Sequence, residues 1–172
     1  MRNFNRKFGR FTAFGLLLLA ACSGDQRPKY WHAGSERPYA IKGVRYYPQT
    51  NYQYSAIGYA SWYGPGFHGK PTSTGRIFNK NKLTAAHRTL PLPSVVIVEN
   101  LNNGRKVKLL VNDRGPFACT DKRIIDVSQR AAEVLGFKRR GFVKVRVTCL
   151  PKESQLAALK YKRRPYPSRR RK

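Results

Sequence analysis

Short stretches with apolar residues at every second position dominate residues 57–150 and constrain the fold more than any other feature. KVKLLVND (106–113) and GFVKVRVTCL (141–150) each place valine or leucine on one side of an extended chain. SVVIVEN (94–100) is a β-branched run, and Asn103-Gly104 is a strong hairpin signal. A helix is predicted where Ser128 can cap QRAAEVLG and Gly136 can end it. Many short strands with one or two short helices predict a mainly β fold, a closed or nearly closed β-barrel.

The N-terminus has the pattern of an export signal. A positively charged start is followed by a short apolar stretch, too short to span a bilayer as a stable helix. Leu19-Ala20-Ala21-Cys22 resembles the bacterial lipobox, which implies that residues 1–21 are removed and that Cys22 carries lipid. Ser23 after the cysteine resembles the outer-membrane sorting pattern. The alternative is an ordinary signal peptide that contains a cysteine.

The charge of the chain restricts its partners. The net charge is +27, and removal of residues 1–21 would lower it by only four. A field of this size favours anionic polymers. The export signal argues against nucleic acid, so cell wall, anionic lipid and lipopolysaccharide remain as the predicted partners. We therefore expect a periplasmic protein anchored through Cys22 in a membrane, the outer membrane by the sorting pattern.

Two segments flank the predicted domain. Residues 22–56 are rich in tyrosine and lack a sustained periodicity, and we interpret them as a tether that lies partly against the domain. A plain tether is the alternative. Residues 151–172 contain many lysines and arginines and are predicted to be a disordered basic tail. This tail either contacts an anionic wall or lipid or has no fixed partner.

Cysteine and histidine add few constraints. Cys119 and Cys149 either form a disulfide, which an oxidising compartment would allow, or are both small buried residues. His32, His68 and His87 show no ligand spacing with cysteines or carboxylates. We therefore predict no metal site and no cofactor.

Several motifs occur in an order typical of one family. They are KGVRYYP (42–48), GYASWYGPGFHGKPTSTG (58–75), LTAAHRTLP (83–91), NLNNGR (100–105), NDRGPF (112–117) and RIIDVSQRAAEVLGF (123–137). Together they resemble the rare lipoprotein A (RlpA) family. The resemblance implies a six-stranded double-psi β-barrel over residues 57–150. It also implies an envelope lipoprotein that acts on peptidoglycan glycan strands. Some members of the family are lytic transglycosylases that prefer strands lacking stem peptides.

The chain departs from the family pattern in two places. Many members carry a C-terminal SPOR domain, whereas here only the basic segment follows residue 150, so a chain without that domain is expected. The family often has a glutamate where this chain has Arg76. A second hypothesis follows from Arg76: a glycan-binding lipoprotein with impaired catalysis, in which Arg76 holds a lactyl or peptide carboxylate. A nucleic-acid binder, suggested by charge alone, is disfavoured.

Asp113 is the leading candidate for the catalytic residue. It follows an alternating strand, where barrel folds place ligand-facing groups. A carboxylate before Arg-Gly-Pro can equally bond its own turn or pair with Arg114. The resemblance matches Asp113 to the aspartate that is thought to be catalytic in the family. A lytic transglycosylase needs only one carboxylic acid in principle, because its nucleophile is already part of the substrate.

His87 matches the family histidine, and the resemblance implies that it orients substrate or shuttles a proton. The alternative is a core histidine held by backbone bonds. Aromatic rings stack on sugar faces, although strand aromatics also fill cores. We assign substrate binding to the remaining motif residues: Ser61, Trp62, Tyr63, Thr72, Arg76, Asn112 and Arg114.

Overall fold

The computed structural model of the protein describes residues 37–49 and 52–162. The predicted signal segment, Cys22 and residues 163–172 of the predicted tail lie outside the described residues. Among the described residues, no helix is long and apolar enough to cross a membrane.

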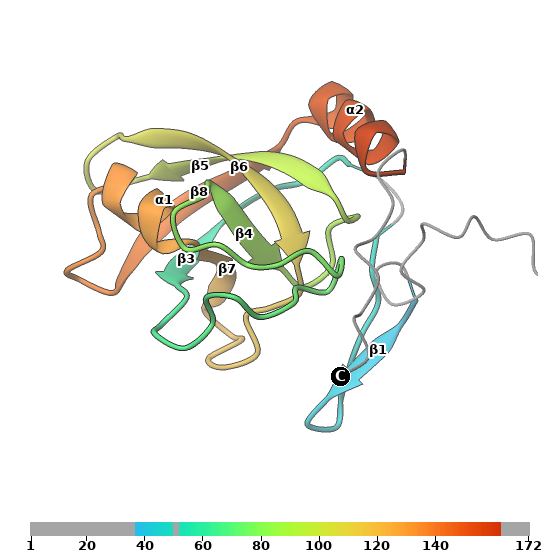
Figure 1. Ribbon diagram of the computed structural model, residues 1–172. Coiled ribbons are helices and arrows are strands. Elements are labelled where there is room, and N and C mark those ends of the chain that lie inside the picture. The colour runs from blue at the N-terminus through green and yellow to red at the C-terminus, as the bar shows by residue number, and fades with distance from the viewer. Residues whose placement is uncertain (1–36, 50–51, 163–172) are drawn as a thin grey trace, which may run out of the picture.

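A closed barrel with the strand order β3-β7-β4-β6-β5-β8 forms the centre of the structure (Figure 1). Two of its contacts, β3–β7 and β4–β6, are parallel, and the others are antiparallel. The mainly β, six-stranded double-psi barrel that the sequence predicts is confirmed. Its strands are β3 (Ser55–Trp62), β4 (Thr84–His87), β5 (Ser94–Asn100), β6 (Lys106–Asp113), β7 (Arg123–Val127) and β8 (Phe142–Cys149).

The alternating residues of β6 and β8 fill the barrel interior as predicted. Val111, Val145 and Val147 are fully buried, while Lys106 and Lys144 on the opposite faces of the same strands are exposed. Because successive side chains point to opposite faces of a strand, the apolar set of each strand reaches the core together. Burial of this surface is the main contribution that stabilises the barrel.

The turn and cap signals also have the predicted structure. Gly104 has φ +71° in the connection between β5 and β6, a conformation that glycine adopts without steric cost. Helix α1 (Gln129–Val134) begins after Ser128, whose side chain accepts a hydrogen bond from the backbone N–H of Ala131. Gly136 follows its end with φ +76°.

A short hairpin from the tyrosine-rich segment lies against the barrel. Its strands are β1 (Tyr39–Ile41) and β2 (Val44–Tyr46), paired antiparallel. The Tyr39 hydroxyl donates to the carbonyl of Arg88 at 2.9 Å, and the rings of Tyr39 and Tyr46 both contact Phe117. This part of the segment is therefore docked, as the sequence interpretation favoured, and is not a plain tether.

Residues 151–162 contradict the predicted disordered tail. They form helix α2 (Pro151–Lys162), which packs beside β5 and β6 (Figure 1). The buried Ser154 hydroxyl accepts a hydrogen bond from the backbone N–H of Val95 at 2.8 Å, and Glu153 pairs with Lys108 at 3.5 Å. The segment contains a run of good helix formers, QLAALK (155–160), but its many cations led us to predict disorder.

The two described cysteines are unpaired. Cys149 is buried in the core, whereas Cys119 is exposed. The disulfide alternative is therefore wrong, and the alternative of two buried residues holds only for Cys149.

Candidate active site

The carboxylate of Asp113, at the end of β6, accepts four hydrogen bonds. Its Oδ1 accepts from the backbone N–H of Ser73 at 2.8 Å, the Ser73 hydroxyl at 2.6 Å and the backbone N–H of Arg114 at 2.8 Å. Its Oδ2 accepts from the Tyr63 hydroxyl at 3.0 Å. All four partners donate, which is the environment of an ionised carboxylate. The alternative in which Asp113 bonds its own turn therefore holds for the bond from Arg114, but three further donors come from distant segments.

The two oxygens of Asp113 are differently placed for chemistry. A carboxylate offers about four acceptor positions in total. Oδ1 already has three donors, whereas Oδ2 has one, so Oδ2 is the oxygen that can accept a further proton or hydrogen bond. The half-buried side chain faces a cleft of about 390 Å³. The cleft is also lined by Lys42, Trp62, Tyr63, Gly64, Phe67, Arg114, Gly115, Pro116, Phe117, Ala118, Arg123 and Asp126.

Tyr63 acts as a fixed donor in this site. Burial raises the pKa of its hydroxyl, and the nearby negative charge of Asp113 raises that pKa further. The hydroxyl therefore keeps its proton and donates a hydrogen bond to Oδ2. The ring packs against Phe78, with centroids 4.4 Å apart, and meets Phe67 edge-on. These contacts fix the donor in front of the carboxylate.

A tight loop brings Ser73 to Asp113. The backbone N–H of Thr72 bonds the carbonyl of Arg76 at 2.7 Å, and Gly75 between them has φ +76°. The Thr74 hydroxyl donates to the carbonyl of Asn112 at 3.0 Å and lies 3.0 Å from the hydroxyl of Thr72. Thr72, a predicted substrate-binding residue, is buried, and its hydroxyl contacts Thr74, which holds the loop on β6.

A second carboxylate, Asp126, lines the same cleft. Ala86 of β4 is in register with Asp113 on one side and with Asp126 on the other. The Oδ1 of Asp126 accepts from the Ser61 hydroxyl and from Arg123, both at 2.5 Å. The position of Asp126 in the cleft is not apparent from the sequence. Only the strand order, in which β4 separates β6 and β7, reveals it.

His87 has the geometry of a core histidine. It is 4% exposed, and its Nδ1 accepts from the backbone N–H groups of Thr89 at 3.2 Å and Leu90 at 3.0 Å. Burial, helped by the charges of Arg88 and Arg114, lowers its pKa from 6.5 to about 3. The ring is therefore neutral near pH 7, and its Nδ1 is already used. These contacts favour the backbone-held alternative over a proton shuttle.

Arg114 also has a structural role, because its side chain bonds backbone carbonyls. Its buried guanidinium donates from Nη1 to the carbonyls of Leu90 at 2.6 Å and His87 at 3.3 Å. Of the other predicted substrate-binding residues, Trp62 lines the Asp113 cleft and donates from its indole to the carbonyl of Lys138 at 3.2 Å. The structure thus brings Trp62, Tyr63, Asp113 and Arg114 together around one cleft.

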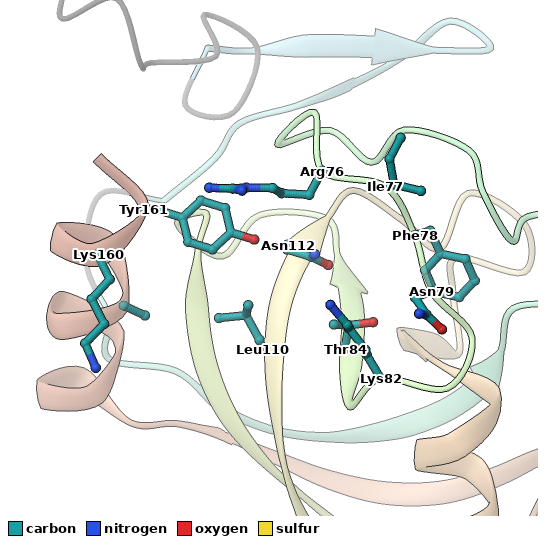
Figure 2. Close-up of a pocket in the computed structure, with 11 residues that line it drawn as sticks. Arg76, Ile77, Phe78, Asn79, Lys82, Thr84, Leu110, Asn112, Lys160 and Tyr161 are labelled. Carbon is teal, nitrogen blue, oxygen red and sulfur yellow. The ribbon is translucent and has the colours of Figure 1, made fainter. Parts of the chain in front are cut away.

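Arg76 and Asn112 line a different pocket, of about 540 Å³, between the barrel and α2 (Figure 2). Arg76 is absent from the lining of the Asp113 cleft. The loop carrying Ser73 and Arg76 thus extends to both cavities. Among the described residues, no group of three or more histidine, cysteine or acidic side chains could hold a metal ion.

Comparison with known proteins identifies the family. A family model described as lytic transglycolase matches residues 55–147. A Rickettsia felis protein named endolytic peptidoglycan transglycosylase RlpA is 54% identical over 120 residues, which cover 68% of this chain and 52% of that protein. A protein of the same name from Neisseria meningitidis serogroup A is 45% identical over 139 residues, covering 79% of this chain and 57% of that protein. The chain belongs to the RlpA family.

This RlpA-family chain spans about half the length of those two curated relatives. Among solved structures, the Streptomyces papain inhibitor (SPI) is similar with a TM-score of 0.45 and 22% identity, covering 56% of this chain and 94% of that one. The resemblance inferred from the motifs is confirmed by the family match, which covers the barrel from β3 to β8.

Proposed function

We propose that this RlpA-family chain is a lytic transglycosylase that cleaves the MurNAc–GlcNAc bonds of peptidoglycan strands lacking stem peptides. The names of the relatives support this activity, which is stated for those proteins. One observation of this chain carries the proposal most directly. Asp113 faces an aromatic-lined cleft with Oδ1 bonded by three donors and Oδ2 by one.

The proposed reaction uses one carboxyl group in two proton transfers. The C6 hydroxyl of MurNAc attacks C1 of the same sugar, so a C1–O6 bond forms while the bond from C1 to O4 of GlcNAc breaks. Oδ2 takes the proton of the C6 hydroxyl as the C1–O6 bond forms and delivers this proton to the departing O4. The carboxyl group ends as it began, and the products are a 1,6-anhydro end and a free GlcNAc hydroxyl. No water is consumed.

Neighbouring residues have supporting roles in this proposal. Ser73 and the backbone of Arg114 fix Oδ1, so the carboxyl group presents Oδ2 to the substrate. Trp62 and Tyr63 supply aromatic surface on which apolar sugar faces can stack. His87 is a positioning residue, because its ring orders the backbone at Thr89 and Leu90.

We propose an envelope location, which the export-signal pattern and the lipobox resemblance of residues 1–23 support. Lipid on Cys22 would anchor the chain in a membrane, the outer membrane by the resemblance of Ser23 to the sorting pattern. The cations of residues 163–172 would add a weak contact with an anionic wall or lipid surface.

Digestion of purified glycan strands without stem peptides tests the catalytic proposal. Products would be read by mass spectrometry for wild type, Asp113→Asn and the control Asp121→Asn, which removes an exposed carboxylate elsewhere. We expect anhydro-ended fragments from wild type and the control, and a loss of about 100-fold or more in Asp113→Asn. Retention of uncut strands by the wild-type protein would contradict catalysis and favour the glycan-binding alternative.

A further inference from the structure

The pocket between α2 and the barrel has a different chemical character from the Asp113 cleft. Its walls come from the segment 76–79, from β4 and β6, and from the last turns of α2 (Figure 2). We call it the Arg76 pocket. It is lined by Arg76, Ile77, Phe78, Asn79, Lys82, Thr84, Leu110, Asn112, Ala157, Lys160 and Tyr161.

The Arg76 pocket carries uncompensated positive charge. Arg76, Lys82 and Lys160 line it, and its lining contains no carboxylate. Within residues 37–49 and 52–162, the ion pairs of the structure involve none of these three cations. Cations that share a partly enclosed site without a counter-charge raise the local concentration of anions. The pocket is therefore suited to a negatively charged group.

Polar groups on the barrel wall support the same conclusion. The Oγ1 of Thr84 is buried and has no hydrogen-bond partner among the described residues. Thr84 pairs with Leu110 of β6, two positions before Asn112, so both polar side chains belong to neighbouring strands of one wall. A buried hydroxyl without a partner is uncommon in folded proteins. Together with the side chain of Asn112, Thr84 places polar groups in the pocket wall beside the cations.

An aromatic contact positions Arg76 itself. Its guanidinium carbon lies 5.0 Å from the centroid of the Tyr161 ring, and Figure 2 shows the two side chains side by side. Stacking against a ring leaves the N–H groups at the edge of the guanidinium plane available to donate. Helix α2 thus holds Arg76 in an orientation from which it can form a bidentate contact with a carboxylate.

The Arg76 pocket and the Asp113 cleft are joined by two pieces of chain. Ser73 bonds Asp113, and Arg76 follows three residues later on the same loop. Asn112, which lines the Arg76 pocket, and Asp113, which lines the cleft, are consecutive residues of β6. A polymer bound over this loop can therefore place one sugar at Asp113 and a charged substituent of another sugar in the Arg76 pocket.

We propose that the Arg76 pocket is a subsite for a carboxylate of the wall polymer, the lactyl carboxylate of a MurNAc residue without its stem peptide. This carboxylate is free in stripped strands and becomes a neutral amide when a stem peptide is attached. The pocket would thereby favour stripped strands by charge. The inference rests on the proposed function for its substrate class, but it concerns binding and can be tested separately from cleavage.

The test compares the affinity of two ligands for four proteins. The ligands are stripped glycan strands and the same strands with their lactyl carboxylates converted to neutral amides. The proteins are wild type, Arg76→Gln, Lys82→Gln and the control Arg139→Gln, which removes an exposed cation outside both cavities. Free stem peptide, added as a competitor, determines whether a peptide carboxylate occupies the pocket instead.

We expect Arg76→Gln and Lys82→Gln to weaken binding of the carboxylate strands by about fivefold each and to leave binding of the amidated strands unchanged. Arg139→Gln should leave binding of both ligands nearly unchanged. Weakening of the carboxylate strands by Arg139→Gln to the same extent as by Arg76→Gln would overturn the proposal, because general electrostatic attraction would then account for the binding. Strong competition by stem peptide would overturn the lactyl assignment. Selective binding without anhydro products would contradict the proposed catalysis and leave this inference standing.

Discussion

The substitution His87→Asn separates a structural histidine from a proton carrier. Asparagine keeps a side-chain acceptor for the backbone N–H groups that bond Nδ1 in the native protein, but it does not titrate. Burial lowers the pKa of His87 from 6.5 to about 3. Because the unfolded chain binds the proton more tightly, the histidine's stabilisation is complete above its unfolded pKa. It is lost as the pH falls towards the folded pKa.

The size of this effect follows from the shift. One pH unit corresponds to about 1.4 kcal/mol, so His87 should remove about 2.5 kcal/mol of unfolding free energy between about pH 6 and about pH 4. At neutral pH the variant should be less stable by about 1–3 kcal/mol, because the edge contact of the ring with Tyr54, at 4.7 Å between centroids, is lost. The difference in unfolding free energy between the two proteins should therefore shrink on acidification. It should reverse in sign if the loss at neutral pH is less than about 2.5 kcal/mol.

Urea unfolding of both proteins at several pH values measures this difference in unfolding free energy. The contributions of all other titrating groups are common to both proteins and cancel in the difference. A difference that stays constant from neutral pH to about pH 4 would refute the structural assignment. Glycan cleavage gives a second readout on the same variant. A proton shuttle at His87 would cost about 100-fold or more in turnover, whereas a positioning residue replaced by another acceptor should cost much less.

Two further predictions concern packing and thiol reactivity. Gly58→Ala should lower the unfolding free energy, measured by urea unfolding, by about 1–3 kcal/mol, because its Cβ would lie 2.7 Å from Cγ2 of Ile124. The control is Gly64→Ala, whose Cβ would meet no atom within 4 Å. Equal effects of the two substitutions would contradict the clash. In a Cys22→Ser background, a thiol reagent should label Cys119 in the native protein and Cys149 only in urea, because burial raises the pKa of the Cys149 thiol. Native labelling of a Cys119→Ser variant would show that Cys149 is accessible.

The barrel was predictable because its strands carry local signals. The alternating residues of β6 and β8, the Asn103-Gly104 turn and the Ser128 cap each act within a few residues of chain. Helix α2 was missed because its packing depends on a distant contact, the bond between Ser154 and Val95 of β5. Local composition alone suggested a charged and unpacked segment.

The candidate site was predictable only in part, and for a related reason. Asp113 was found through its motif and its position after a strand. The partners that make it a site, Tyr63 and Ser73, lie 50 and 40 residues away, and Asp126 reaches the cleft through the barrel's strand order. His87 could not be assigned from sequence, because a buried acceptor and a proton shuttle use the same residue type.

Arg76 illustrates how a departure from a family motif depends on its structural surroundings. The family pattern often has a glutamate at this position, so the sequence suggested a weakened catalytic site. In the structure its guanidinium stacks on Tyr161 of α2 and lines the Arg76 pocket, while the Asp113 carboxylate is held by Ser73 and Tyr63. Since one carboxyl group can carry both proton transfers of the proposed reaction, the arginine need not remove the chemistry. Its position in the Arg76 pocket suggests that the change acts on which charged strands are bound.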